Sequence, residues 1–343
     1  MAYTTINKST DYFNTKLFTG NGGTQAVTGI GHQPDWVWLK SRSVADSPIL
    51  FDAVRGATKR LMSNAASAES TEAQEVQSFD SDGFTVGNSD NANRSGATMV
   101  GWNWKAGTTG SGNTGGSGTY KAYSYSVNTT AGFSIVKYVG NGTGGHTIPH
   151  HLGVAPSNVI IKDISASNSW ISKMKGYDGY LYLNNSDAGT SNSTWLPTDA
   201  NNLTLANTWG AYNTNDATYI AYCFAEKTGY SKFGSYTGNG NADGSFIYTG
   251  GKPAWVMIKK TNDTHAWRIY DSARDPFNLT EKILEPNTSN AEATSGTYVL
   301  DLVSNGFKFR GNGDGVNGSG QSFIYMAFGQ TLVGSNNIPA TAR

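Results

Sequence analysis

The chain has 343 residues, which suits two or three domains, and its 25 lysine and arginine residues balance its 25 aspartate and glutamate residues. This balance excludes the strongly basic surface that binds nucleic acid or anionic membranes, so we expect neither partner. No apolar run is long enough to insert into a bilayer, and the single cysteine, Cys223, excludes a disulfide framework and a cysteine-based metal site. The start of the chain lacks a basic segment followed by an apolar one, so we expect no secretory signal.

Glycine, asparagine, serine and threonine take the place of charged residues, which make up only 15% of the chain. Such a composition is poor in helix formers and rich in turn formers, and it favours short strands. We therefore predict an all-β fold made of antiparallel β-sandwiches.

Three divergent copies of one pattern follow one another along the chain. Each copy opens with a Gly-Asn-Gly turn, and 20 to 22 residues after the first glycine it reaches the lysine that ends an apolar strand. The turn residues tolerate positive φ, so we predict a tight hairpin there. Side chains of the apolar strand alternate between core and outside, so in copy one we expect Val37 and Leu39 inside and Trp38 outside. The turns are Gly20-Asn21-Gly22, Gly140-Asn141-Gly142 and Gly238-Asn239-Gly240, and the strands are 36–40, 159–162 and 255–259.

The later parts of the copies also correspond. An aspartate followed three residues later by an arginine occurs in copies one and three, and Lys175 takes the place of the aspartate in copy two. We interpret this motif as a structural ion pair buried between strands, although paired carboxylates facing a cleft are what glycan hydrolysis requires. Further on, Asp82-Gly83 and Asn305-Gly306 predict hairpins. The aspartate–arginine pairs are Asp52 with Arg55 and Asp271 with Arg274, and the closing apolar strands are 100–104, 220–224 and 324–328.

These matches predict three sandwich units with distinct boundaries. Copy one, with an N-terminal arm, occupies residues 1–106, copy two 132–229, and copy three, with a C-terminal tail, 230–343. The glycine-, serine- and threonine-rich segment 107–131 is expected to be a flexible linker. We therefore expect copies two and three to pack as one rigid unit, copy one to be hinged, and a protease to cut first within 107–118.

Distinctive phrases run from one end of the chain to the other: YFNTKLFTGNG (12–22), FDAVRGATK (51–59), WNWK (102–105), YCFAE (222–226), KFGSYTGNG (232–240) and the ending 330–343. In these phrases the chain resembles the repeated lectin-like β-sandwich structural proteins of marine tailed bacteriophages. The resemblance implies three tandem jelly-roll units, similar to concanavalin A and laminin G domains, and no catalytic residues. Fibre proteins of such phages often carry a separate attachment region, but here the first copy begins near residue 12. We therefore expect either the N-terminal arm to insert as a strand into a neighbour or the first sandwich to be the docking module.

The same resemblance implies a non-enzymatic virion protein that is made in the host cytoplasm and carried on the virion surface. We expect a tail fibre or spike subunit that adheres to host surface glycan. Its expected partners are other virion proteins, further copies of the chain (a trimer being the usual form of a fibre) and a host glycan, with no cofactor. The alternative is a capsid decoration or head-fibre protein with a purely structural role, and a weaker alternative is a glycan depolymerase.

Sugar binding is the function for which the sequence offers candidate residues. Sugars stack on exposed aromatic rings, and Trp195, Trp209 and Tyr212 lie in asparagine- and threonine-rich segments of copy two rather than in alternating strands. Burial in a sandwich core or in a subunit contact is the alternative fate of these rings.

Candidates for metal binding are weaker. His146, His150 and His151 form a cluster, but no nearby aspartate, glutamate or cysteine completes a ligand set, so we predict a surface loop. The acidic turns at 80–83 and 313–315 are candidates for calcium, yet turn chemistry alone explains both. We therefore predict no metal site.

Overall fold

The computed structural model describes residues 4–331. Within this range the chain is all-β, as predicted: its strands form several antiparallel sheets, and its helical segments are one turn long. No helix in this range is long and apolar enough to span a membrane. The predicted C-terminal tail beyond residue 331 and the first three residues of the arm lie outside the described residues. The helical segments are η1 (Ser9–Asp11), α1 (Asp90–Asn93) and α2 (Asp314–Asn317).

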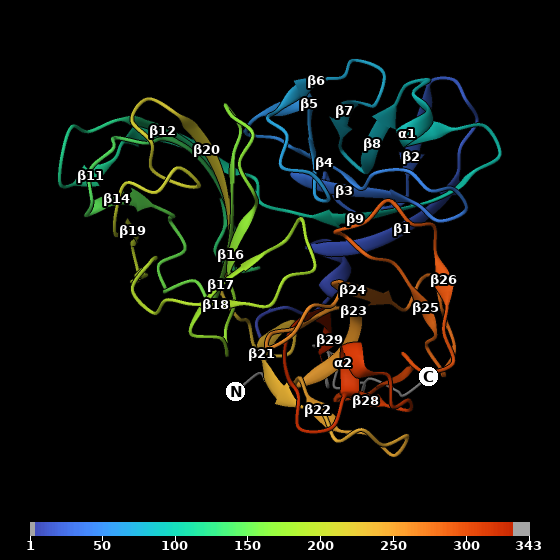
Figure 1. Cartoon of the computed structure of the whole chain (residues 1–343). Helices are drawn as coiled ribbons and strands as arrows, with labels where there is room; N and C mark the ends of the chain where they lie inside the picture. Colours follow the sequence, from blue (N-terminus) through green and yellow to red (C-terminus); the bar gives the residue numbers. More distant parts are fainter. Residues whose placement is uncertain (1–3, 332–343) are drawn as a thin grey trace.

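Copy one consists of a large sheet of strand order β1-β9-β3-β4-β5-β6 and a small sheet of order β2-β8-β7 (Figure 1). The sheets lie face to face, with Val27 and Phe84 of the small sheet packed in one cluster with Val37 and Phe51 of the large sheet. This two-layer packing is that of a β-sandwich. The strands are β1 Phe13–Thr19, β2 Gln25–Thr28, β3 Trp36–Ser41, β4 Ile49–Asp52, β5 Gly56–Met62, β6 Ser70–Thr71, β7 Val76–Asp80, β8 Gly83–Val86 and β9 Thr98–Trp104.

The strand order of copy one recurs further along the chain. The run β1-β9-β3-β4 corresponds to β13-β20-β15-β16 and to β21-β29-β23-β24, and the small-sheet pair β2-β8 corresponds to β14-β19 and β22-β28. Copy two contains β10 Thr108–Asn113, β11 Gly115–Gly116, β12 Ala122–Asn128, β13 Phe133–Val139, β14 His146–Pro149, β15 Asn158–Asp163, β16 Ile171–Lys173, β17 Gly179–Tyr182, β18 Thr190–Ser191, β19 Asn202–Leu205 and β20 Thr218–Phe224. Copy three contains β21 Ser231–Thr237, β22 Phe246–Tyr248, β23 Gly251–Lys260, β24 Arg268–Asp271, β25 Lys282–Ile283, β26 Ala293–Thr294, β27 Leu300–Val303, β28 Gly306–Phe309 and β29 Ser322–Thr331.

Two of the predicted hairpins form and three do not. The Asp82-Gly83 turn joins β7 to β8, and the Asn305-Gly306 turn joins β27 to β28, as predicted. The Gly-Asn-Gly turns, by contrast, do not close hairpins, because β1 pairs with β9 while β2 pairs with β8 in the other sheet. Each of these turns therefore carries the chain from the large sheet to the small one.

A buried asparagine far along the chain holds each Gly-Asn-Gly turn in place. In copy one the backbone N–H of Asn21 donates to Oδ1 of Asn93 at 2.9 Å, and Asn93 is fully buried. A Cβ at Gly20 would collide with the carbonyl oxygen of Arg94, and Gly22 has a φ of 72°, in the left-handed region that favours glycine. The turn thus requires both glycines for different reasons. The same bond joins Asn141 to Asn213 and Asn239 to Asn317, each at 3.1 Å.

The central strands are buried on both faces, so the expected outward face is wrong. Val37 and Leu39 of β3 pack inside the sandwich of copy one, as predicted. Trp38 does not face solvent but joins a second, central cluster, to which all three copies contribute. Figure 1 accordingly shows the large sheets turned toward a common centre and the small sheets turned outward. Members of this central cluster include Trp36, Trp102, Trp104, Phe133, Ile160, Tyr222, Trp255, Met257 and Phe328, together with Ile6 from the N-terminal arm.

The expected flexible linker and hinge are also wrong. Within 107–131, β10 pairs with β12, and β12 pairs with β13, so the segment extends the large sheet of copy two. Gly110 and Gly112 of β10 have no side chains, and the rings of Tyr125 and Tyr123 pack over them. Copy one is further held to the other copies by the shared central cluster. The glycine-rich composition therefore serves close packing under aromatic rings rather than flexibility.

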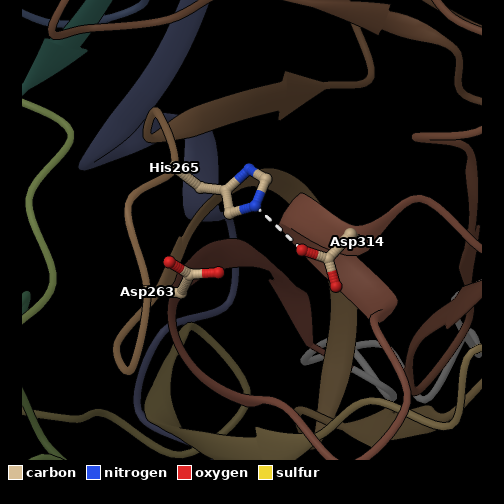
Figure 2. Close-up of side chains that lie close together, drawn as sticks. All are labelled: Asp263, His265 and Asp314. Atoms are coloured by element: carbon tan, nitrogen blue, oxygen red, sulfur yellow. Dashed lines mark hydrogen bonds and ion pairs between the residues drawn. The ribbon is translucent and has the colours of Figure 1, made fainter.

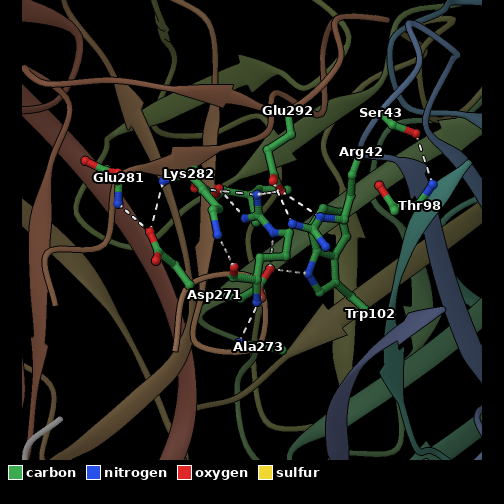
Figure 3. Close-up of polar contacts among 12 residues, drawn as sticks. Arg42, Ser43, Thr98, Trp102, Asp271, Ala273, Glu281, Lys282 and Glu292 are labelled. Carbon is green, nitrogen blue, oxygen red and sulfur yellow. Dashed lines mark hydrogen bonds and ion pairs between the residues drawn. The ribbon is translucent and has the colours of Figure 1, made fainter. Parts of the chain in front are cut away.

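Two buried ion pairs lie beside the central cluster, as the aspartate–arginine motif predicted. The Nε of Arg55 donates to Asp52 at 2.5 Å, the Nε of Arg274 donates to Asp271 at 2.6 Å, and all four side chains are fully buried. Each aspartate also accepts a bond from another copy, Asp52 from the hydroxyl of Tyr222 at 2.7 Å. Asp271 accepts from the indole N–H of Trp102 at 2.9 Å (Figure 3).

The remaining interface, between copies two and three, lacks both the aspartate acceptor and the side-chain donor of this contact. In copy two the pairing of Val159 with Lys173 places Met174 at the aspartate's position, so the assignment of Lys175 to that position is wrong. The donor position of Trp102 and Tyr222 is taken in copy three by Met326. Met174 and Met326 both lie in the central cluster, so acceptor and donor have been replaced together.

The lysine that ends each apolar strand is buried, contrary to the expected outward face. Lys40 donates to the carbonyl oxygen of Ser289 in copy three at 3.0 Å, and Lys259 donates to that of Ser186 in copy two at 3.3 Å. Burial lowers the pKa of Lys40, Lys162 and Lys259 to about 8 in each case. The three ammonium groups therefore oppose folding while they are charged.

Asp271→Ala is expected to lower the free energy of unfolding by about 3–5 kcal/mol, because the buried Arg274 then keeps only Glu292 as a counter-charge and the indole N–H of Trp102 loses its acceptor. Denaturant titration followed by tryptophan fluorescence measures the change. Asp243, an aspartate of the same copy whose side chain is 81% exposed, provides the control Asp243→Ala, which should leave the midpoint nearly unchanged. Equal losses in the two variants would contradict the role of the buried pair.

Stability is expected to rise with pH between 7.5 and 9, by about 1 kcal/mol for each of the three buried lysines. Their folded pKa of about 8 lies below the unfolded value of 10.5, so in this window the unfolded chain binds more protons than the folded chain. Urea titrations at both pH values measure the slope. Lys162→Met should remove about a third of it, and a slope that is flat in the parent protein would refute the assignment.

Candidate functional site

Two of the three predicted sugar-binding rings lie in the core of copy two. Trp195 is 2% exposed and Tyr212 is 0% exposed. The indole N–H of Trp195 donates to the carbonyl oxygen of Gly179 at 3.0 Å, so even its polar edge is engaged inside the protein. A sugar can stack only on an accessible ring face. The prediction of Trp195 and Tyr212 as ligand-binding residues is therefore wrong.

Trp209 covers the same cluster from its outer side. Its ring is half-buried and lies 4.9 Å from Tyr180 and 5.6 Å from Tyr212, measured between ring centroids. The asparagine- and threonine-rich segments that singled out these three residues therefore carry part of the core of copy two.

The histidine cluster is dispersed among separate partners, and the predicted surface loop is wrong for two of its members. His146 is buried and bonds Thr114 at 2.6 Å, and His150 is buried and bonds the carbonyl oxygen of Asp199 at 3.0 Å. His151 stacks on Tyr125 with 3.7 Å between ring centroids. Burial lowers the pKa of all three imidazoles, which favours their neutral forms in these structural contacts.

Asp263, His265 and Asp314 bring their polar atoms together at one edge of copy three (Figure 2). The ammonium group of Lys260 lies 3.0 Å from Asp263 and 2.6 Å from Asp314, between the two carboxylates. Burial opposes its charge, but hydrogen bonds to these carboxylates raise the pKa of Lys260, and the bonds to Lys260 lower the pKa of Asp314 and of Asp263. The protein's own cation thus occupies the position between the two carboxylates.

The other acidic turn considered for calcium is also occupied by the protein itself. Asp82 accepts the backbone N–H groups of Gly29 and Gly31 at 2.9 and 2.6 Å. These bonds lower the pKa of Asp82 and fix the neighbouring loop. A loop more than 50 residues away in the sequence therefore engages this carboxylate, rather than its own turn, which the sequence had suggested.

Two exposed aromatic rings lie on the small sheet of copy three. Phe246 and Tyr248 of β22 are 48% and 54% exposed, and both alternate with the buried Ile247. The registers of β2, β14 and β22 show which residues stand at the same places in the other copies. These are Ala26 and Thr28 in copy one, and Thr147 and Pro149 in copy two. The two exposed rings are therefore a property of copy three.

A hollow opens beside Tyr248 where the chain passes from copy two into copy three, and we call it the Tyr248 hollow. It combines an exposed ring with hydroxyl, ammonium and carboxylate groups. Residues that line it include Glu226, Thr228, Ser231, Lys232, Tyr248 and Thr249.

The carboxylate in the Tyr248 hollow is held firmly. Oε1 of Glu226 accepts the backbone N–H of Phe233 at 2.8 Å and lies 3.4 Å from the Nζ of Lys232. Oε2 of Glu226 accepts from the Nζ of Lys175 at 2.5 Å. Fixed polar groups beside an exposed ring are suited to a sugar, whose apolar face can stack on the ring while its hydroxyls find hydrogen-bond partners.

Sequence reasoning missed Tyr248 because the segment 246–248 reads as an ordinary alternating strand. The available signal was a comparison of the three copies at this strand. It required the register of β22 against β2 and β14, which the short and dissimilar segments do not reveal on their own.

Trp195→Ala is expected to destabilise the protein by about 3–5 kcal/mol, because it empties the core of copy two. Tyr248→Ala should leave the unfolding midpoint close to that of the parent, because the ring is largely exposed. Thermal unfolding followed by circular dichroism compares the two variants. A large loss for Tyr248→Ala would show that the ring is structural and would remove it as a site candidate.

A search of curated proteins finds no match, and a search of solved structures also finds none. A family model described as "Domain of unknown function (DUF7483)" matches residues 8–331, which cover the two-layer copies and the Tyr248 hollow. The match extends over nearly the whole chain, and the chain therefore belongs to the DUF7483 family.

Proposed function

We propose that this chain is a non-enzymatic surface component of a phage virion, a tail fibre or spike subunit that adheres to glycan on the host surface. The resemblance to virion proteins supports the location. The observation that carries the adhesion is the Tyr248 hollow, in which an exposed aromatic ring stands beside fixed polar groups. Made in the host cytoplasm, the protein would act on the exterior of the particle.

We further propose that the three copies are tandem jelly-roll units of the lectin-like type. The recurrence of one strand order supports this assignment, since each copy repeats the same large-sheet run and small-sheet pair. Such sandwiches present loops and outer strands on a rigid scaffold, which suits recognition of an extended surface.

The burial of the paired aspartates supports a non-enzymatic role. Glycan hydrolysis needs two carboxyl groups that face the scissile bond. Asp52 and Asp271 are fully buried and neutralised by their arginines, so neither can reach a substrate. The carboxylate of Glu226, whose side chain is 21% exposed, is engaged by Lys175 and by a backbone N–H.

Other virion proteins and further copies of the chain, in a trimer, are the partners that we propose. The central cluster is already filled by the three copies of one chain. Contacts between chains would therefore use the outer sheets and loops, where Phe277 is 75% exposed. That exposed ring also favours the alternative, a capsid decoration whose ligand is a neighbouring virion protein.

Virions that carry a label at the C-terminus of this protein should show it on the tail or at fibre tips when they are imaged. Particles with Tyr248→Ala should adsorb to host cells at least about tenfold less efficiently, while Phe246→Ala, on the same strand but outside the hollow, should leave adsorption unchanged. A label spread over the head, with normal adsorption of the Tyr248→Ala particles, would contradict the adhesion proposal and favour a capsid decoration protein.

A further inference from the structure

We propose that the Tyr248 hollow selects sugars that carry an anionic group, a carboxylate or a sulfate, over neutral sugars. This inference rests on the proposed glycan adhesion and specifies its ligand. It follows from the charges around the ring, from the elements that supply them and from a comparison of the three copies.

The hollow has a surplus of positive charge. The two ammonium groups of Lys175 and Lys232 face a single carboxylate, that of Glu226. The close ammonium group of Lys175 compensates the charge of Glu226, so the ammonium group of Lys232 is the excess positive charge. An incoming anionic group would therefore meet a net positive surface.

Lys232 is the group best placed to hold an anion. Its side chain is 40% exposed, and its Nζ lies 3.4 Å from Glu226, a longer contact than the 2.5 Å bond that Lys175 makes. An ammonium group has three donor hydrogens, so Lys232 can keep this contact and still donate to a ligand. A bond from an ammonium to a carboxylate or sulfate is stronger than one to a neutral hydroxyl.

The ring and the ammonium group come from different strands, and copy three alone carries both of them at these positions. Tyr248 ends β22 of the small sheet, whereas Lys232 lies on β21 of the large sheet and pairs with Ala327. The positions that correspond to Lys232 are Asn14 in copy one and Ser134 in copy two. Copies one and two thus lack both the ring and the charge. In copy three, two separate substitutions place an aromatic ring and an ammonium group in the same hollow.

The hollow also depends on the contact between copies two and three. Lys175 and Glu226 belong to copy two, whereas Lys232 and the backbone N–H of Phe233, which also contact Glu226, belong to copy three. Met174 and Phe233, the chain neighbours of the two lysines, both lie in the central cluster. The central packing therefore sets the distance between Lys175 and Lys232, so the anion site is a product of the assembled chain rather than of one sandwich.

Isothermal titration of the full chain with three trisaccharides tests the proposal: a galacturonic acid trimer, a neutral galactose trimer and a sulfated galactose trimer. We expect an acidic trimer to bind about tenfold more tightly than the neutral one at low salt, with the advantage shrinking as salt is added. The carboxylate and sulfate arms distinguish the two anionic groups.

Variants separate charge from stacking. Lys232→Gln should remove the preference for the acidic sugar and leave neutral binding unchanged, Lys232→Arg should restore the preference, and Tyr248→Ala should weaken binding of both sugars. Lys59→Gln, at a lysine of copy one that is 39% exposed, is the control and should have no effect. Unchanged unfolding midpoints show that the variants fold.

The outcomes distinguish this inference from the proposed function. Equal binding of neutral and acidic trimers that is lost with Tyr248→Ala would overturn the anion preference and leave glycan adhesion standing. Acidic binding that survives both Tyr248→Ala and Lys232→Gln would place the ligand elsewhere and overturn the site. Failure of every sugar to bind, together with normal adsorption of Tyr248→Ala particles, would overturn both proposals.

Discussion

The packing of three large sheets around one aromatic centre is the constraint on which the rest of this structure depends. Each large sheet is covered by its small sheet on one face and by the other copies on the second face, so its central strands have no solvent side. Trp36 and Trp38, which alternate with core residues, become core residues themselves. The lysines at the ends of these strands are buried for the same reason, and their lowered pKa is a consequence of the assembly.

Polar contacts inside this centre make the copies non-interchangeable. Two interfaces place a buried aspartate of one copy against a donor of another, Asp52 with Tyr222 and Asp271 with Trp102. A buried aspartate tolerates only a neighbour that donates to it, so acceptor and donor must change together. The third interface shows that paired change, with methionine at both positions. The divergence of the copies thus follows in part from the different neighbours that each one meets.

Because the copies share their scaffold, function is best sought where they differ on the surface. Most differences in the interior concern packing, as the aromatic core of copy two illustrates. The Tyr248 hollow is one such surface difference, since copy three alone combines a ring with an ammonium group there. Comparing the three copies of one chain therefore shows which surface residues differ while the strand order stays the same.

Local patterns in the sequence were sufficient to predict the all-β class, the three copies and the aspartate–arginine pairs. They also predicted the hairpins at Asp82-Gly83 and Asn305-Gly306. Strand alternation, turn chemistry and short spacings act over a few residues, so a sequence shows them directly. Only the tertiary structure decided which faces are covered, because the covering residues are more than 100 positions away, as in the bond from Trp102 to Asp271. Tertiary packing buried Trp195 and Tyr212 and left Tyr248 exposed, whereas the strands in the expected linker pair with near neighbours in the sequence. A sequence pattern fixes how a side chain alternates, whereas its accessibility depends on what packs against it.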